Sequence, residues 1–335
     1  MVSATHRVTG SWRGRLIWPL AALAALLLFN LLFTDGFFNI RLSDGHLYGS
    51  LIDILNRAAP VMLLSLGMTL VIATAGIDLS VGAVMAIAGS VAAWLITRGQ
   101  LGLVPVVALT LGACLLAGAW NGLLVAFFGV QPIVATLVLM VAGRGVAQLI
   151  TGGQILTYER PGFSFIGGGH FLTLPFTVTI VAGMLVLTAV FTRRTALGLF
   201  IEASGGNETA SRYSGVNVGM VKLFTYAFCG LCAGVAGLIV ASDIKAADAN
   251  NAGLYLELDA IMAVVIGGTA LTGGRFTLVG SMIGALIIQT LTTTILTRGV
   301  PVEFTLVVKA LVVLLVCLLQ SPALRAMVLR RGVAR

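Results

Sequence analysis

Ten apolar segments follow one another along almost the whole chain, and only short polar connections separate them. The segments lie near 16–34, 58–75, 81–97, 103–128, 133–150, 175–192, 222–241, 259–271, 277–297 and 304–320. A membrane-spanning helix needs about 20 mainly apolar residues. Most segments approach this length, whereas 259–271 is short and is expected to be tilted, broken or re-entrant. The sequence therefore predicts an all-α, polytopic transmembrane bundle of about ten spans.

The composition excludes an ordinary soluble protein. Of the 335 residues, 59% are hydrophobic and 10% are charged, against about 25% charged in a typical soluble domain. The formal net charge of +8 is also a feature of nucleic-acid-binding proteins. Here, however, the basic residues are scattered in short runs between apolar segments, and membrane topology explains them better. We therefore expect lipid around the chain and no nucleic-acid partner.

The distribution of basic residues predicts the orientation. With the N-terminus inside, twelve Lys and Arg residues fall in cytoplasmic pieces and six fall outside, as the positive-inside rule favours. Both termini are then cytoplasmic, as the tails 1–15 and 321–335, and 193–221 is the longest cytoplasmic loop. We expect 1–335 to be a single transmembrane domain. Spans two to five and seven to ten then have opposite orientations around the sixth, which permits an inverted repeat.

Small residues in the seventh segment favour close packing. Gly230 and Gly234 form a G-x-x-x-G pattern that Gly237 extends, and small residues let membrane helices approach closely. Cys229 and Cys232 form a C-x-x-C, but apolar residues flank the pair. We interpret both thiols as packing groups.

The sequence lacks the usual marks of catalysis. It contains no G-x-x-x-x-G-K-[ST] loop and no H-E-x-x-H, the motifs of nucleotide hydrolysis and of one class of zinc enzyme. His6, His46 and His170 all lie in tails or loops. We therefore expect no catalytic residue, no metal site and no cofactor on this chain.

A neutral, hydroxyl-rich solute needs polar groups along its path that are not charged. Amides and hydroxyls exchange hydrogen bonds without the desolvation cost of a charge. The candidate path residues are Thr74, Asp78, Asn121, Gln131, Gln148 and Gln289. Each could equally make a contact between helices. Asp78 has a further interpretation as an N-cap that accepts a backbone N–H of the third span.

The main alternative function is an ion-coupled secondary sugar transporter, which needs ionisable residues at membrane depth. The apolar segments offer few. We expect Arg144 to pair structurally and Lys309 to extend toward a membrane surface. A membrane-embedded enzyme would need clustered acids, histidines or basic residues, which the sequence lacks. The polar amides within the spans speak only mildly against a non-transporting scaffold or receptor.

The loop 193–221 mixes helix formers with glycine and polar residues. It predicts a short surface helix around Asn207 to Tyr213. Thr209, Ala210 and Tyr213 would share one face of this helix, because residues three and four positions apart are neighbours.

Four segments resemble the permease subunits of ribose-type ABC sugar importers. They are TAGIDLSVGAVMAIAG (74–89), WNGLLVAFFGVQPIVATLVLM (120–140), GGNETASRYSGVNV (205–218) and ELDAIMAVVIGGTALTGGRFTLVGSMIGALI (257–287). The resemblance extends from about Gly49 onward. Ala75 departs from it, because the family usually has glycine before Gly76. Three further segments are similar to galactofuranose-type permeases: GSLIDILNRAAPV (49–61), AGRGVAQLITGGQI (142–155) and SDIKAADANNAGLYLELDAI (242–261).

The resemblance implies a transport subunit of the bacterial inner membrane, without an ATPase site of its own. It implies a second permease beside this chain, related but different, and ATP-binding subunits that hold ATP and Mg²⁺. A periplasmic sugar-binding protein would deliver the monosaccharide, best matched by galactofuranose. It also implies a region that couples to the ATPase, at Gly205, Gly206, Asn207, Ala210 and Gly215.

Overall fold

The computed structural model describes residues 12–43, 45–99 and 101–320. The long helices are α1 (Trp12–Phe33), α2 (Ser50–Ala73), α3 (Val81–Arg98), α4 (Leu103–Ala126), α5 (Pro132–Thr151), α7 (Phe176–Arg194), α10 (Val218–Ile244), α12 (Leu278–Thr297) and α13 (Val302–Gln320). The shorter helices are α6 (Pro161–Gly168), α8 (Leu197–Gly206), α9 (Glu208–Tyr213) and α11 (Leu256–Ile266).

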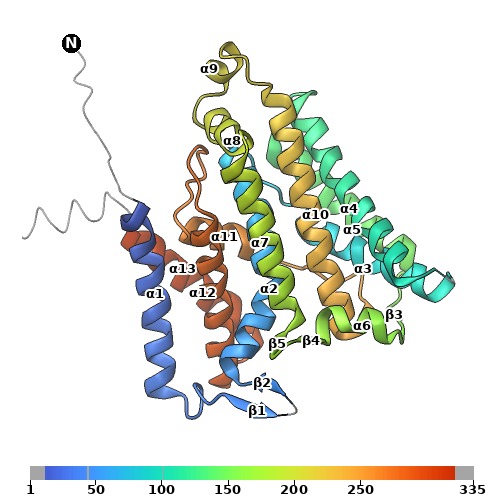
Figure 1. The fold of residues 1–335 in the computed structure, drawn as a ribbon, viewed down its shortest axis with the longest axis vertical. Helices are drawn as coiled ribbons and strands as arrows, with labels where there is room; N and C mark the ends of the chain where they lie inside the picture. The colour runs from blue at the N-terminus through green and yellow to red at the C-terminus, as the bar shows by residue number, and fades with distance from the viewer. Residues whose placement is uncertain (1–11, 44, 100, 321–335) are drawn as a thin grey trace, which may run out of the picture.

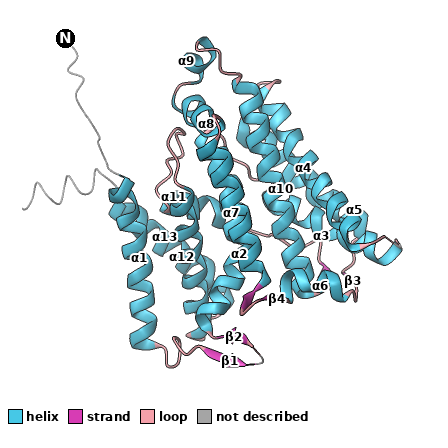
Figure 2. Cartoon of the chain, in the orientation of Figure 1, coloured by secondary structure: helices cyan, strands magenta, loops and turns pink. Residues whose placement is uncertain are grey.

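Strands form only short antiparallel pairs in the described part of the chain. They are β1 (Arg41–Ser43) with β2 (His46–Tyr48), β3 (Leu156–Thr157) with β6 (Ala246–Ala247), and β4 (His170–Phe171) with β5 (Leu174–Pro175). Figures 1 and 2 show α8 and α9 at one end of the bundle and these strands at the other. We call these the α9 end and the strand end.

The prediction of an all-α, polytopic membrane bundle is confirmed. Among the described residues, eight helices are long and apolar enough to cross a bilayer: α1, α2, α3, α4, α5, α7, α10 and α12. The two other predicted segments correspond to α11 and α13. With 11 residues, α11 is too short to cross a hydrocarbon core at a rise of about 1.5 Å per residue. The inverted repeat stays a prediction.

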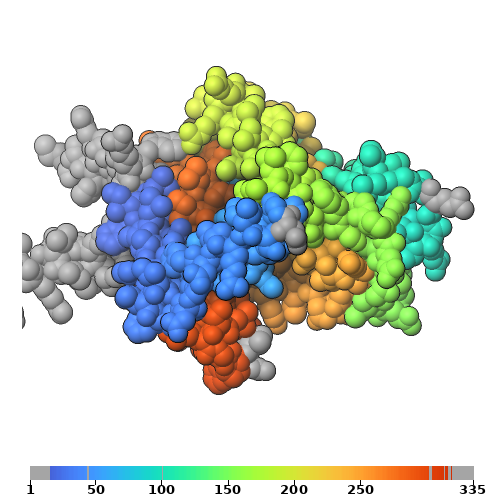
Figure 3. Space-filling view, turned by 60° about the horizontal axis from the view of Figure 1, so that its bottom comes forward, coloured from blue at the N-terminus to red at the C-terminus, as the bar shows by residue number. Residues whose placement is uncertain are grey.

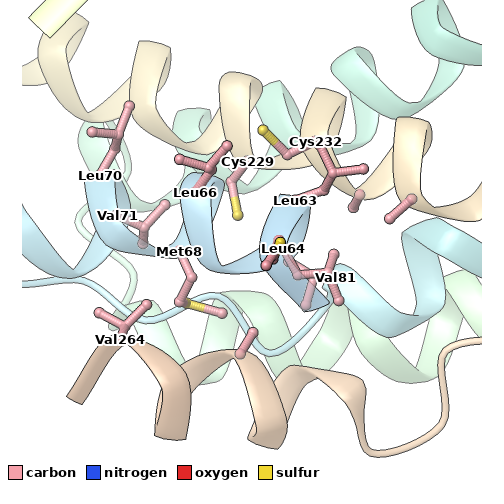
Figure 4. Close-up of a cluster of buried hydrophobic side chains, with 14 of the residues drawn as sticks. Leu63, Leu64, Leu66, Met68, Leu70, Val71, Val81, Cys229, Cys232 and Val264 are labelled. Atoms are coloured by element: carbon pink, nitrogen blue, oxygen red, sulfur yellow. The ribbon is translucent and has the colours of Figure 1, made fainter. Parts of the chain in front are cut away.

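The eight candidate spans form an inner and an outer group. Most spanning residues of α2, α3, α10 and α12 are buried within the protein, whereas fewer than a quarter are buried in α1, α4, α5 and α7. Figure 4 shows the centre of the inner group, where Leu66 of α2 lies beside Cys229 of α10, and Met68 of α2 points toward Val264 of α11. Cys229 and Cys232 are buried free thiols, which confirms their interpretation as packing groups.

The glycines of α10 let this helix approach its neighbours closely, as the sequence predicts. A Cβ atom on Gly230 would overlap the Cys114 carbonyl oxygen of α4, and one on Gly118 of α4 would overlap the Tyr226 carbonyl oxygen. Further along α10, Gly237 faces the backbone of Met85 in α3. The backbones of α3, α4 and α10 therefore lie closer together than a larger residue at these glycine positions would allow.

Three predicted boundaries are wrong. The second span begins at Ser50 rather than 58, because the polar residues before 58 face a cavity and not lipid. α1 begins at Trp12, so the last four residues of the predicted tail 1–15 are helical. Residues 1–11 and the predicted tail 321–335 lie outside the described residues. α7 ends at Arg194 and α10 begins at Val218, so the connection is shorter than 193–221.

Ala75, at the position where the resemblance leads us to expect glycine, has a φ of 60°. This left-handed conformation is costly for residues with a Cβ atom. Space is also tight there, because a Cβ on Gly273 would lie 2.8 Å from the Ala75 Cβ. At the end of α2, Ala75 therefore adopts a backbone conformation that glycine would adopt at lower cost.

We expect Gly230→Ala to lower the free energy of unfolding by about 1–3 kcal/mol, the range for overpacking a tight core. The added methyl group must push α10 away from α4. Thermal unfolding of the purified chain in mild detergent measures the effect. Gly183→Ala in α7 is the matched control, because a Cβ there meets no atom within 4 Å; equal stability of the two variants would contradict the packing argument.

Candidate functional site

A cavity of about 670 Å³ lies in the half of the bundle nearer the strand end. The first residues of α2 and the last residues of α10 and α12 line it, together with parts of α6, α11 and α13. In Figure 3, which brings the strand end forward, the blue segment that includes the start of α2 lies beside orange and red segments from the last third of the chain. Residues distant in sequence therefore build one site.

Two polar stripes face this cavity. On α2 the stripe is Asp53, Asn56 and Arg57, and on α12 it is Gln289, Thr292, Thr293 and Thr297. Members of each stripe are three or four positions apart, so they share one side of their helix. The cavity also has apolar walls from Pro60, Val61, Ile239 and Val240.

A buried ion pair forms another part of the wall. Lys309 Nζ of α13 donates to Asp259 Oδ2 of α11 at 2.8 Å, and both side chains are about nine-tenths buried. Each charge compensates the other, because an isolated charge loses favourable hydration free energy when it is buried. The sequence-based expectation that Lys309 extends toward a membrane surface is therefore wrong.

A hydrogen bond from Thr177 orients Asn56. The Thr177 hydroxyl at the start of α7 donates to Asn56 Oδ1 at 2.5 Å, and Thr177 is almost fully buried. The second cavity amide, Gln289, uses its Nε2 in a long contact of 3.4 Å to Thr293 Oγ1. The cavity thus contains an oriented amide group on α2 and another amide on α12.

The structure separates the six predicted path residues. Gln289 lines the cavity. Gln131 is the N-cap residue of α5 and is exposed, and Gln148 Nε2 donates to Asn250 Oδ1 at 2.7 Å on the surface. Thr74, Asp78 and Asn121 are buried elsewhere in the bundle. Their contact with a solute stays a prediction.

Asp78 belongs to a buried hydrogen-bonded cluster between α2 and α3. Its Oδ1 accepts from the backbone N–H of Ser80 at 2.9 Å and from the Ser80 hydroxyl at 2.6 Å. Asn121 Nδ2 of α4 donates to the same hydroxyl at 2.9 Å. Because α3 begins at Val81 with Ser80 as its N-cap, the interpretation of Asp78 as the N-cap is wrong, and Asp78 instead holds the turn just before the helix. Arg144 donates to the carbonyl oxygens of Ala249 and Ala252.

At the α9 end, the predicted short helix is confirmed as α9. Asn207 is its N-cap, and Asn207 Oδ1 accepts from the Ala210 backbone N–H at 2.9 Å. Thr209, Ala210 and Tyr213 are all exposed. Gly215, which ends the turn after α9, has a φ of 84°. The predicted coupling residues therefore surround one capped, solvent-facing helix.

Glu208 fixes α9 to the start of α10. Its carboxylate accepts from Arg212 Nη2 at 2.8 Å and from Lys222 Nζ at 2.7 Å. These contacts, led by the Lys222 hydrogen bond, hold the pKa of Glu208 below its ordinary value. The resulting stabilisation is present above the ordinary pKa of the carboxyl and is lost as the pH falls through the lowered one.

Gly205 connects this region to the end of α2. A Cβ atom on Gly205 would overlap the Ala73 carbonyl oxygen, so only glycine fits. The same oxygen accepts from the Gly274 backbone N–H at 2.8 Å. Three segments thus meet at one carbonyl group: the end of α8, the end of α2 and the loop before α12. The neighbouring Gly206 has no such contact, because a Cβ atom there would meet open space.

The sequence reasoning missed most of the cavity residues: Asp53, Asn56, Arg57, Asp243, Asp259, Thr292, Thr293 and Lys309. For the three residues of α2, the sequence did contain a signal that they share one side of a helix. Asp53, Asn56 and Arg57 follow the spacing of one helical face, but starting the second span at 58 assigned them to a loop. The Asp259–Lys309 pair has no local signal, because 50 positions separate its members.

Residues 50–317 match the family described as branched-chain amino acid transport system / permease component. The chain belongs to this permease family. It is 57% identical to the galactofuranose transporter permease protein YtfT of Escherichia coli K12, over 92% of this chain and 91% of that protein. With its candidate spans, it is a multi-pass protein of the bacterial inner membrane.

Other relatives are also named as sugar permeases. The chain is 39% identical to the fructose import permease FruF of Bifidobacterium longum, over 92% of this chain and 88% of that protein. It is 41% identical to the ribose import permease RbsC of Escherichia coli K12, over 81% of this chain and 85% of that protein. No solved structure matches the chain significantly.

We expect Glu208→Gln to loosen α9. The two ion pairs are partly exposed, so the free energy of local unfolding of α9 should fall by no more than about 1 kcal/mol. Amide hydrogen exchange over residues 208–213 at neutral pH should become faster. Glu202→Gln in α8 is the control, because Glu202 forms no ion pair among the described residues; unchanged exchange in the Glu208 variant would show that the pairs do not hold the helix.

Proposed function

We propose that this chain is the membrane-spanning permease subunit of an ABC importer that carries galactofuranose into the cell. The observation that carries the proposal is the 57% identity to the Escherichia coli galactofuranose transporter permease over nearly the full length of both chains. The fructose and ribose permeases, at about 40% identity, support a monosaccharide as the class of cargo.

The cavity supports a hydroxylated cargo over a branched-chain amino acid, which the broad family description names. Asn56, Gln289, Thr292 and Thr293 supply amide and hydroxyl groups along its walls. Such groups can both donate and accept hydrogen bonds, as sugar hydroxyls require. An apolar side chain would leave most of them unpaired, at a cost.

In this proposal the chain is a single transmembrane domain that works with other proteins. A related but different permease pairs with it, ATP-binding subunits that hold ATP and Mg²⁺ bind at the α9 end, and a periplasmic sugar-binding protein binds at the strand end. Both termini are then cytoplasmic. This orientation agrees with the basic residues of the predicted inside pieces.

The junction at Ala73 supports a coupling role for Gly205, Gly206, Asn207, Ala210 and Gly215. The exposed face of α9 would bind in a groove of the ATPase. Movement of α8 would reach α2 through the close contact of Gly205 with Ala73. ATP binding would then shift the permease pair between two conformations, which it can do only by favouring one of them.

Reconstitution tests the function. The complex of this chain with its ATPase, partner permease and binding protein in liposomes should accumulate labelled galactofuranose only with ATP present. Excess L-leucine should not compete. Uptake by this chain alone, driven by an ion gradient without ATP, would replace the proposal with the secondary-transporter alternative.

We expect Gly215→Val to abolish ATP-driven uptake while membrane insertion stays normal. A β-branched residue is strongly disfavoured at the φ of 84° that Gly215 adopts, so the exposed turn after α9 must change shape. Deletion of 205–215 should have the same effect. Gly145→Val in α5 is the control, because a Cβ there meets no atom within 4 Å. Normal uptake by the deletion variant would contradict the proposed coupling role of residues 205–215.

A further inference from the structure

The cavity near the strand end offers hydrogen-bonding groups that the protein itself leaves unused. Thr177 occupies Asn56 Oδ1, and no hydrogen bond among the described residues involves Asn56 Nδ2. Gln289 contacts Thr293 through Nε2, and its Oε1 has no partner among the described residues. One free donor on α2 and one free acceptor on α12 therefore line the same space.

We propose that this cavity is a weak binding site for one neutral, hydroxyl-rich solute, with Asn56 and Gln289 as its main hydrogen-bonding residues. This inference rests on the proposed function, because it places a sugar inside the permease chain. A sugar hydroxyl can accept from Asn56 Nδ2 and donate to Gln289 Oε1. Thr177 acts as a positioning residue, because its hydroxyl orients the Asn56 amide.

The charges of the cavity favour a neutral solute. Asp259 and Lys309 neutralise each other in the wall. The remaining charged lining residues are Asp53, Arg57 and Asp243, two acids and one base, and all three are exposed in this chain. Their net negative charge repels an anionic solute such as a sugar phosphate or a sugar acid.

The lining also argues for weak binding. None of the described residues that line the cavity is aromatic, so no flat ring is present against which a sugar ring could stack. Aromatic side chains supply much of the contact area of tight sites. A transport path must hold its cargo weakly enough to release it, and hydrogen bonds from amides and hydroxyls alone meet that need.

The test is cysteine protection. Thr292→Cys, which places a thiol in the cavity wall and leaves Asn56 and Gln289 in place, is made in a chain whose four native cysteines are replaced by serine or alanine. The reconstituted complex is then labelled with a water-soluble, membrane-impermeant methanethiosulfonate reagent. Galactofuranose, D-ribose or L-leucine is present at increasing concentration. Gln148→Cys is the control, because it places a thiol outside the cavity, where Gln148 contacts Asn250. Thr293→Cys, at the next residue along the same wall, serves if the first variant does not assemble.

We expect the sugar to slow labelling of Thr292→Cys and to leave Gln148→Cys unaffected. When free sugar is about ten times its dissociation constant, labelling should fall about tenfold, because only the unoccupied fraction reacts. Protection should require millimolar sugar, and L-leucine should give none. Equal labelling with and without sugar at Thr292→Cys, or at Thr293→Cys where that variant replaces it, would overturn the inference.

The Thr177→Val variant tests the positioning role. It removes the hydroxyl that orients Asn56, and it should raise the sugar concentration needed for half-protection of Thr292→Cys without changing the labelling rate in the absence of sugar. An unchanged half-protection concentration would show that Thr177 has only a structural role.

The outcomes separate this inference from the proposed function. ATP-driven uptake of sugar by the unmodified complex, without protection of the cavity cysteines, would leave the function standing and remove the cavity site. Protection by L-leucine alone, together with ATP-driven leucine uptake, would instead replace the cargo that the proposed function names.

Discussion

The close approach of α10 to α4 and α3 holds the inner spans to one another and to the outer span α4. In a bilayer the hydrophobic effect does not drive helices against one another, so their association depends on close packing and hydrogen bonds. Gly118, Gly230 and Gly237 remove the side chains that would keep these backbones apart. Once α10 is fixed in this way, its last turns form one wall of the cavity and its first turn carries the Lys222 partner of Glu208.

α2 connects the two functional regions. Its first residues line the cavity, and its last carbonyl groups contact α8 and the loop before α12. A helix of 24 residues is about 36 Å long at 1.5 Å per residue. It is also the most deeply buried of the candidate spans. A rigid, buried helix of this length is a suitable element to carry a movement at the α9 end toward the cavity.

Local patterns predicted much of this structure. Apolar length placed nearly every span, and the short segment 259–271 was expected to differ from the others. The mixed loop predicted α9 with the right exposed face, and the glycine spacing predicted the packing of α10. The sequence was least informative where segments far apart meet. Lys309 gives no sign that Asp259 is its partner, and the contact of Gly205 with Ala73 depends on the packing of two separate helices.

Polar residues were also assigned wrongly for a physical reason. Asp53 and Arg57 were expected in a loop because charges are costly in lipid, but a helix that faces a water-accessible cavity tolerates them. Conversely, Gln131 and Gln148 were expected along the path because their amides are polar but uncharged, yet both are surface residues. Residue type alone does not distinguish a cavity wall from a surface contact.

The division into inner and outer spans has a consequence for biosynthesis. α1 emerges from the ribosome first and has a mean hydropathy of 2.3, whereas α2 follows with 1.5 and carries the polar residues of the cavity. The main partners of α2 in the inner group, α10 and α12, are synthesised much later. Until then, α2 must remain in the bilayer with its polar face uncovered. Because α1 packs against α12 rather than against α2 in the described part of the chain, the insertion machinery would have to shelter that face until the second half of the chain arrives.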